Sequence, residues 1–213
     1  MVLRSHLALA AAVLIIIAAS SACGGSSSSA TTTFPTVTQL KAALLTADDL
    51  PTGYTEKKNA ADTNDYGHLC DKAKVSRIEP ARKVSVLFSK GGFGPFIVEG
   101  LGAFRSKARA SESLAAARAE AGVCKTFTNM DRNGNPEPGS VLALSFPTLG
   151  DESAAFKVEK ATQELPLSEN VVMIRRGAVV VTVVTIGIAG ADSKVAKLEP
   201  LARKALERID QAR

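Results

Sequence analysis

Apolar and polar positions along the second half of the chain predict a set of β-strands. From Ala154 to Lys160 apolar and charged side chains alternate, which is the pattern of a strand with one face in water. Val171–Ile174 and Val179–Ile188 are apolar on both sides. Arg175-Arg176-Gly177 separates these two runs, so they predict a hairpin. Because both faces of this hairpin are apolar, we expect it to be central in a sheet and covered.

Further strands and three helices are expected on either side of this hairpin. Thr46 and Asp49 predict a capped turn of helix, and Ser106 is a suitable N-cap for the second long helix. The other predicted strands are Val84–Phe88, Phe96–Phe104, Lys125–Asn129 and Val141–Phe146. The predicted helices are Val37–Leu45, Lys107–Ala121 and a C-terminal stretch from Ser193, in which Pro200 marks either a kink or the first turn.

These elements predict an α+β fold for residues 37–213. We expect a twisted antiparallel sheet of about six or seven strands, with helices packed on one side. Tryptophan is absent and eight phenylalanines are present, so the core is expected to be mainly aliphatic. The length of this segment is that of one domain.

The N-terminus predicts export and attachment to a membrane. A basic residue, Arg4, precedes an apolar run that ends in Ser20-Ser21-Ala22-Cys23. The run is shorter than the roughly 20 residues of a transmembrane helix, and its length is typical of a secretory signal. The segment resembles a bacterial lipoprotein signal, which implies a signal peptide at 1–22 and a diacylglyceryl group with an N-acyl chain such as palmitate at Cys23. Cleavage after Ala22 without lipidation, and an uncleaved anchor, are the alternatives.

Residues 23–36 are rich in Gly, Ser and Thr and predict a flexible tether. Threonines in this stretch could carry O-linked sugar. The expected location of the following domain is the extracytoplasmic face of the cell membrane.

The remaining two cysteines, Cys70 and Cys124, form an even pair in an oxidising compartment. We therefore predict a disulfide between them, worth about 4 kcal/mol in the chain-entropy model. The alternative is a metal site made by both cysteines with His68 and Asp71. Export argues against free thiolates, so no metal is expected.

The net charge of +5 is spread along the sequence. Outside the cell, such an excess suits anionic headgroups or wall polymers, but the preferred interpretation is an ordinary solvated surface. We expect no nucleic-acid partner, because no motif that combines aromatic and basic residues is present.

No catalytic constellation is found in the sequence, and neither an enzyme nor a cofactor is expected. Common hydrolase, metalloprotease and P-loop motifs are absent. The acidic pairs Asp48-Asp49 and Asp151-Glu152 are interpreted as solvated or capping groups. Gly91–Pro95 is followed by a predicted strand rather than a helix, so it is interpreted as a hairpin loop rather than a phosphate site. Phe93 is interpreted as a core residue, with an exposed contact for lipid or a partner as the alternative. Residues 131–139 resemble only the first half of a calcium loop and are also interpreted as a hairpin loop.

Several segments together resemble the extracytoplasmic sensor domains and lipoproteins of actinobacteria that are related to the sensor domain of mycobacterial PknH-type kinases. They are Leu44–Thr55, Cys70, the E-G-L-G-A-F stretch before the Ala-rich helix, Cys124, Pro147–Ser153 and Val172–Val181. The resemblance implies a twisted antiparallel sheet with helices on one face and an open cleft. It also implies sensing of an external ligand, although this chain contains no kinase domain.

The leading hypothesis is therefore a lipid-anchored, non-enzymatic ligand-binding or sensor-type domain of the cell envelope. Its expected partners are the membrane, through the lipid at Cys23, and a small apolar ligand or an envelope polymer. An envelope lipid carrier or chaperone, and a protein–protein scaffold at the cell surface, are the alternatives. The sequence assigns no ligand-binding residues.

Overall fold

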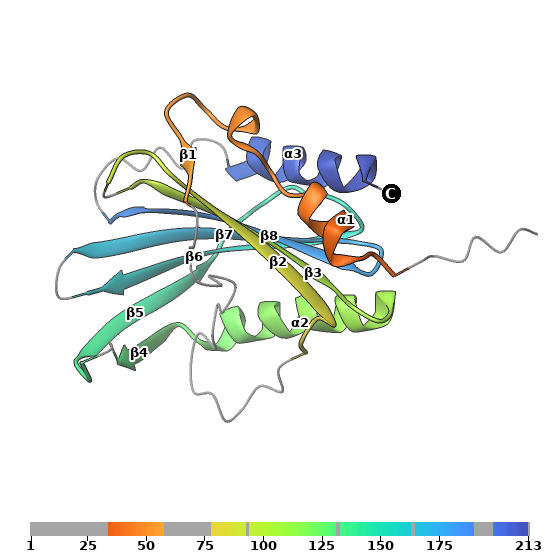
Figure 1. Cartoon of the computed structure of the whole chain (residues 1–213). Coiled ribbons are helices and arrows are strands. Elements are labelled where there is room, and N and C mark those ends of the chain that lie inside the picture. Colours follow the sequence, from red (N-terminus) through yellow and green to blue (C-terminus); the bar gives the residue numbers. More distant parts are fainter. Residues whose placement is uncertain are drawn as a thin grey trace, which may run out of the picture. The chain divides into compact units, whose positions relative to one another are not determined.

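The computed structural model of the chain describes residues 34–57, 78–92, 94–130, 133–162, 165–189 and 198–212. The chain divides into two units, Met1–Thr33 and Phe34–Arg213, and all described residues belong to the second. This unit contains an antiparallel sheet with helices on both faces (Figure 1). Its elements are α1 (Val37–Ala42), η1 (Ala47–Asp49), β1 (Thr55–Glu56), β2 (Arg82–Ser89), β3 (Phe96–Ala103), α2 (Lys107–Val123), β4 (Thr126–Met130), β5 (Pro136–Ala143), β6 (Glu152–Ala161), β7 (Pro166–Arg176), β8 (Val179–Ile188) and α3 (Leu198–Gln211).

The strand order confirms that the most apolar hairpin is central. The strands follow the order β1-β2-β3-β8-β7-β6-β5-β4, so β7 and β8 have neighbours on both edges. In β8, Val181 and Val183 pack into the cluster on one face, whereas Val180 and Val184 pack on the other. Gly177 has a φ of 64° in the turn between the two strands, a conformation that favours glycine.

The number of strands differs from the expected six or seven, because the sheet of the described residues has eight. The additional strand is β1, which pairs with the end of β2. Both of its residues are exposed, so it has no apolar alternation that sequence analysis could detect. Backbone pairing alone defines this strand.

The expectation that all helices pack on one side is wrong. α1 and α3 cover one face of the sheet, and α2 lies on the opposite face (Figure 1). Below, the first is called the α1/α3 face and the second the α2 face. On the α2 face, Leu114 is fully buried, and Ala110 packs with Phe104 and Val180. Since β7 and β8 are apolar on both sides, a single helical layer would leave one apolar face in water.

Strand β5 begins inside the segment that was expected to be a loop. Pro136 and Pro138 pair only with β4, and pairing with β6 starts at Gly139. Proline is tolerated there because the strand needs no second ladder at these positions. Gly139 is also required sterically, since an added Cβ would lie 2.6 Å from the Glu159 carbonyl oxygen.

The helix starts follow the signals expected from the sequence, whereas α1 ends earlier than expected, at Ala42, and α2 ends later, at Val123. The Thr46 N–H donates to Asp49 Oδ2 at 2.8 Å at the start of η1, and the Arg109 N–H donates to Ser106 Oγ at 3.2 Å at the start of α2. Pro200 lies in the first turn of α3, where its missing N–H has no consequence. Within the described residues α3 begins at Leu198, which agrees with the alternative that places Pro200 in the first turn.

The N-terminal end of the described chain contacts the sheet. The Arg82 guanidinium lies 4.5 Å from the centre of the Phe34 ring, and Arg82 Nη1 donates to the Phe34 carbonyl at 3.3 Å. Thr36 then caps α1 through a capping box with Gln39. These contacts hold the start of α1 against β2.

Candidate functional site

The residues expected to carry lipid and disulfide are only partly within the described structure. Cys23, Cys70 and His68, like Phe93, lie outside the described residues. Cys124 is the C-cap of α2 and is 2% exposed. Lipidation at Cys23 and pairing of Cys70 with Cys124 therefore remain predictions.

Within the described ranges, no group of three or more His, Cys, Asp or Glu side chains is placed to hold a metal ion. The alternative metal site proposed for the cysteines lies largely outside these ranges. None of the helices in the described part of the chain is long and apolar enough to cross a bilayer.

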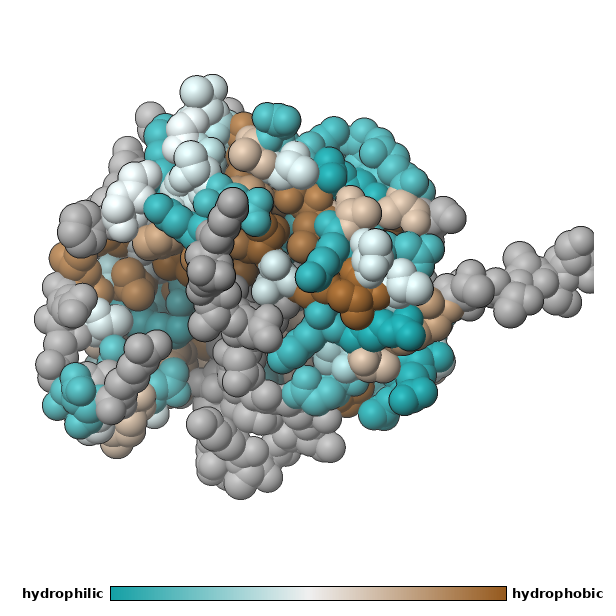
Figure 2. All heavy atoms as spheres, viewed as in Figure 1, coloured by the Kyte–Doolittle hydropathy of each residue, from teal (hydrophilic) through white to brown (hydrophobic). Residues whose placement is uncertain are grey.

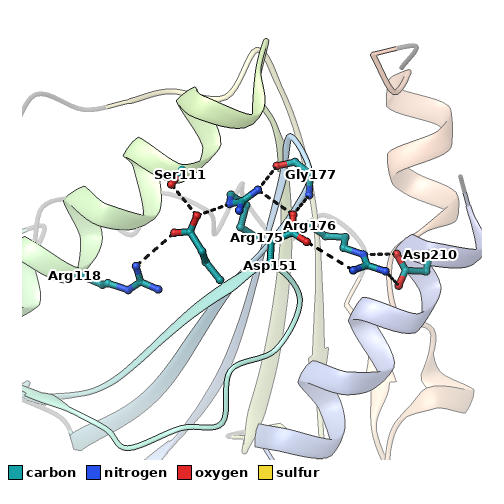
Figure 3. A network of polar contacts seen from close by, with 8 residues as sticks. Ser111, Arg118, Asp151, Arg175, Arg176, Gly177 and Asp210 are labelled. Carbon is teal, nitrogen blue, oxygen red and sulfur yellow. Dashed lines mark hydrogen bonds and ion pairs between the residues drawn. The ribbon is translucent and has the colours of Figure 1, made fainter. Parts of the chain in front are cut away.

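A network of charged side chains surrounds the two arginines of the β7–β8 turn (Figure 3). Glu152, at the start of β6, accepts hydrogen bonds from Ser111 Oγ and from Arg175 Nε, both at 2.8 Å. Arg118 of α2 lies 3.5 Å from the same carboxylate. The hydrogen bond from the Ser111 hydroxyl, and to a smaller extent Arg175, holds the pKa of Glu152 below its usual range. The network thus ties α2 to the sheet.

The neighbouring arginine extends the network to the opposite layer. Arg176 makes a bidentate ion pair with Asp210 of α3, with Nε–Oδ1 and Nη2–Oδ2 distances of 2.8 Å (Figure 3). This pairing raises the pKa of Arg176. Successive residues of a strand point to opposite faces, so Arg175 reaches α2 and Arg176 reaches α3.

Both acidic pairs that the sequence drew attention to are engaged in such contacts. Asp151 Oδ2 accepts the Gly177 N–H at 2.7 Å and lies 2.9 Å from Arg175 Nη1. Asp49 caps η1 and lies 3.1 Å from Arg208 Nη1 of α3. These carboxylates fix turns and helices, as the capping interpretation predicts.

The most unusual polar residue is Glu99 of β3, which sequence analysis did not identify as a site. Its relative exposure is 0%, and its strand neighbours are Val86 and Val183. Burial raises the pKa of Glu99 to about 8, while the Leu45 N–H and Arg208 lower it and Asp49 raises it. An acidic residue inside the apolar run Phe96–Ala103 was the signal that could have revealed it.

A second polar group lies farther along the same α1/α3 face. Ser168 and Asn170 of β7 are buried, and Asn170 pairs in register with Thr185 of β8. Ser168 Oγ and Thr185 Oγ1 have no hydrogen-bond partner among the described residues. Buried hydroxyls without partners are uncommon in folded proteins.

Comparison with known proteins shows a likeness in fold and none in sequence family. No protein-family model matches the sequence, and no curated protein matches it. The fold resembles the extracellular domain of PknH from Mycobacterium tuberculosis. The two structures align with a TM-score of 0.59 at 13% identity, over 84% of this chain and 96% of that domain. At this identity the likeness concerns the fold.

Proposed function

We propose that this chain is a lipid-anchored, non-enzymatic ligand-binding or sensor-type domain on the extracytoplasmic face of the cell membrane. The observation that carries the proposal is the likeness to the extracellular domain of PknH over nearly all of that domain. The N-terminal signal with Cys23 and the Gly/Ser/Thr tether support export and anchoring. The resemblance of short sequence segments to actinobacterial sensor domains points in the same direction.

Anchoring is tested with Cys23→Ala. The variant removes the lipid acceptor and leaves the domain unchanged, so we expect it to be released from the membrane fraction and to lose labelling by a fatty-acid probe. Ser21→Ala is the matched control, which should stay in the membrane. Retention of the Cys23→Ala variant in the membrane fraction would refute the lipid anchor.

For the ligand, we propose the α1/α3 face around Ser168, Asn170 and Thr185. Ligand sites combine apolar walls with a few polar groups, and here two buried hydroxyls lie beside the apolar cluster of that face. Native mass spectrometry of the protein purified from its membrane should detect a co-purifying small molecule. Thr185→Val should reduce its occupancy, whereas Thr128→Val, at an exposed position of β4, should not. A wild-type protein that carries no such molecule would oppose this assignment.

A protein-binding surface is the second candidate, favoured by apolar side chains on the sheet edge. Met130 of β4 is 67% exposed and Leu142 of β5 is 61% exposed. By strand alternation both lie on the α1/α3 face, because Phe127 and Val141 pack on the α2 face. Figure 2 shows further apolar residues that reach the surface between polar ones. An envelope lipid carrier would differ from both candidates by co-purifying with lipid in the native mass spectrum.

A further inference from the structure

Glu99 makes one strong contact and lacks a second. Its Oε2 accepts the Leu45 N–H at 2.6 Å, and its Oε1 has no hydrogen-bond partner within the described residues. Because the adjacent strands offer Val86 and Val183, the sheet itself provides no charge to balance an ionised carboxylate. A buried carboxylate in such surroundings favours its neutral form.

The contact with Leu45 links Glu99 to the segment that covers it. Residues 40–50 span the end of α1, the following loop and η1, and they are here called the covering segment. Its buried side chains all belong to the cluster on the α1/α3 face: Leu40, Ala43, Leu44, Leu45 and Leu50. The segment follows the predicted tether, the cap at Thr36 and the first residues of α1.

The charged groups that face Glu99 come from η1 and α3. From η1, Asp49 lies 3.1 Å from Arg208 Nη1 and 3.9 Å from Lys204 Nζ. From α3, Arg208 also donates through Nη2 to the Ala42 carbonyl at 3.3 Å. Arg208 Nε is buried and has no partner among the described residues, and Glu99 Oε1 likewise has none. The charge of Arg208 lowers the pKa of Glu99.

We propose that Glu99 is a proton-controlled latch for the covering segment. When the carboxyl is neutral, the segment packs on the sheet as observed. When the carboxyl ionises, it competes with Asp49 and the Ala42 carbonyl for Arg208, and keeping the anion away from water becomes unfavourable in spite of the Leu45 N–H bond. States in which the segment lifts from β3 and water reaches the carboxylate are then favoured. The latch depends neither on the lipid nor on the ligand of the proposed function.

The range in which the latch operates follows from the burial of Glu99. Its pKa of about 8 means that the carboxyl is neutral in the packed state at mildly acidic and neutral pH. In the open state water reaches the carboxyl, and its pKa returns toward 4.5. Between these two values, opening releases a proton, so the opening equilibrium rises by up to about tenfold per pH unit.

Hydrogen–deuterium exchange of the full-length protein tests the latch. Protection factors, corrected for intrinsic exchange, are measured for peptides of the covering segment from pH 5 to pH 9. We expect protection to fall by up to about tenfold per pH unit between about pH 5 and 8 in the wild type. Glu99→Gln should remove this dependence, and the control Glu112→Gln, an exposed residue of α2, should retain it. Protection that is independent of pH in the wild type, or unchanged pH dependence in Glu99→Gln, would overturn the proposal.

Two further variants keep the test valid if Glu99→Gln does not fold. Arg208→Gln removes a cation that favours ionised Glu99, so the pH dependence should move to higher pH. Asp49→Asn removes an anion and a competitor for Arg208, so the pH dependence of protection should move to lower pH. If the pH dependence of protection shifts in opposite directions in the two variants, the latch is supported. Shifts in the same direction, or no shift, refute it.

Discussion

Replacing Glu99 with Gln should change how the global stability of the domain depends on pH. Gln has nearly the same shape and can still accept the Leu45 N–H through its amide oxygen, but it cannot ionise. The substitution therefore removes the charge while leaving the packing against Val86 and Val183 in place.

The magnitude follows from the difference in pKa between the two states. The pKa of Glu99 is raised from 4.5 to about 8 in the folded protein, and each unit corresponds to about 1.4 kcal/mol. An acid with a raised folded pKa contributes its full stability below about pH 4.5, and that contribution is lost as the pH rises toward 8. The free energy of unfolding of the wild type should therefore fall, relative to Glu99→Gln, by up to about 5 kcal/mol across this range.

Urea denaturation of both proteins at pH 5, 6, 7, 8 and 9 measures this difference. Subtracting the two curves removes the effect of titrating groups that do not interact with Glu99. We expect similar stability at pH 5 and a variant more stable than the wild type at pH 8 and above. Parallel curves with a constant offset would refute the reasoning, because they would mean that Glu99 does not change its protonation on unfolding.

Three more predictions concern packing and covalent structure. Gly139→Ala should lower the free energy of unfolding by about 1–3 kcal/mol, because the added Cβ has no room. The control Gly122→Ala, whose Cβ meets nothing within 4 Å, should be neutral or stabilising. Equal urea-denaturation midpoints for the two variants would contradict the packing argument. Arg176→Gln breaks a partly exposed ion pair with α3 and should lower the urea midpoint only slightly, with the difference shrinking at high salt; a salt-independent loss would point to packing instead. Mass mapping without reduction should find a peptide that joins Cys70 to Cys124, and two free thiols would disprove the predicted disulfide.

Sequence analysis predicted the centre of this fold well because the relevant signals are local and strong. Val171–Ile174 and Val179–Ile188 are apolar on both sides, and only a central, covered hairpin satisfies that pattern. The caps at Ser106 and Thr46 were also predictable, since each depends on residues three positions apart. Prolines hid the start of β5, because their tolerance depends on which edge of the strand is paired.

The candidate sites were much less predictable. A glutamate in an apolar strand is visible in the sequence, but its full burial depends on residues 40–50 and on α3, which are remote along the chain. The same holds for Ser168 and Thr185, whose lack of partners is a property of the packed sheet. Sequence analysis placed the two adjacent arginines in a turn. That Arg175 contacts the α2 side and Arg176 contacts α3 could be known only from the three-dimensional arrangement.

The sequence by itself determined the central strands, the capped helices and the expectation of an exported domain, because local periodicity and short motifs encode these features. Tertiary structure alone decided that helices cover both faces, that a two-residue strand completes the sheet, and that Glu99 is fully buried beneath residues 40–50. The physical reason is that burial and charge balance are set by groups far apart in the chain, and their effect exists only once those groups are packed together.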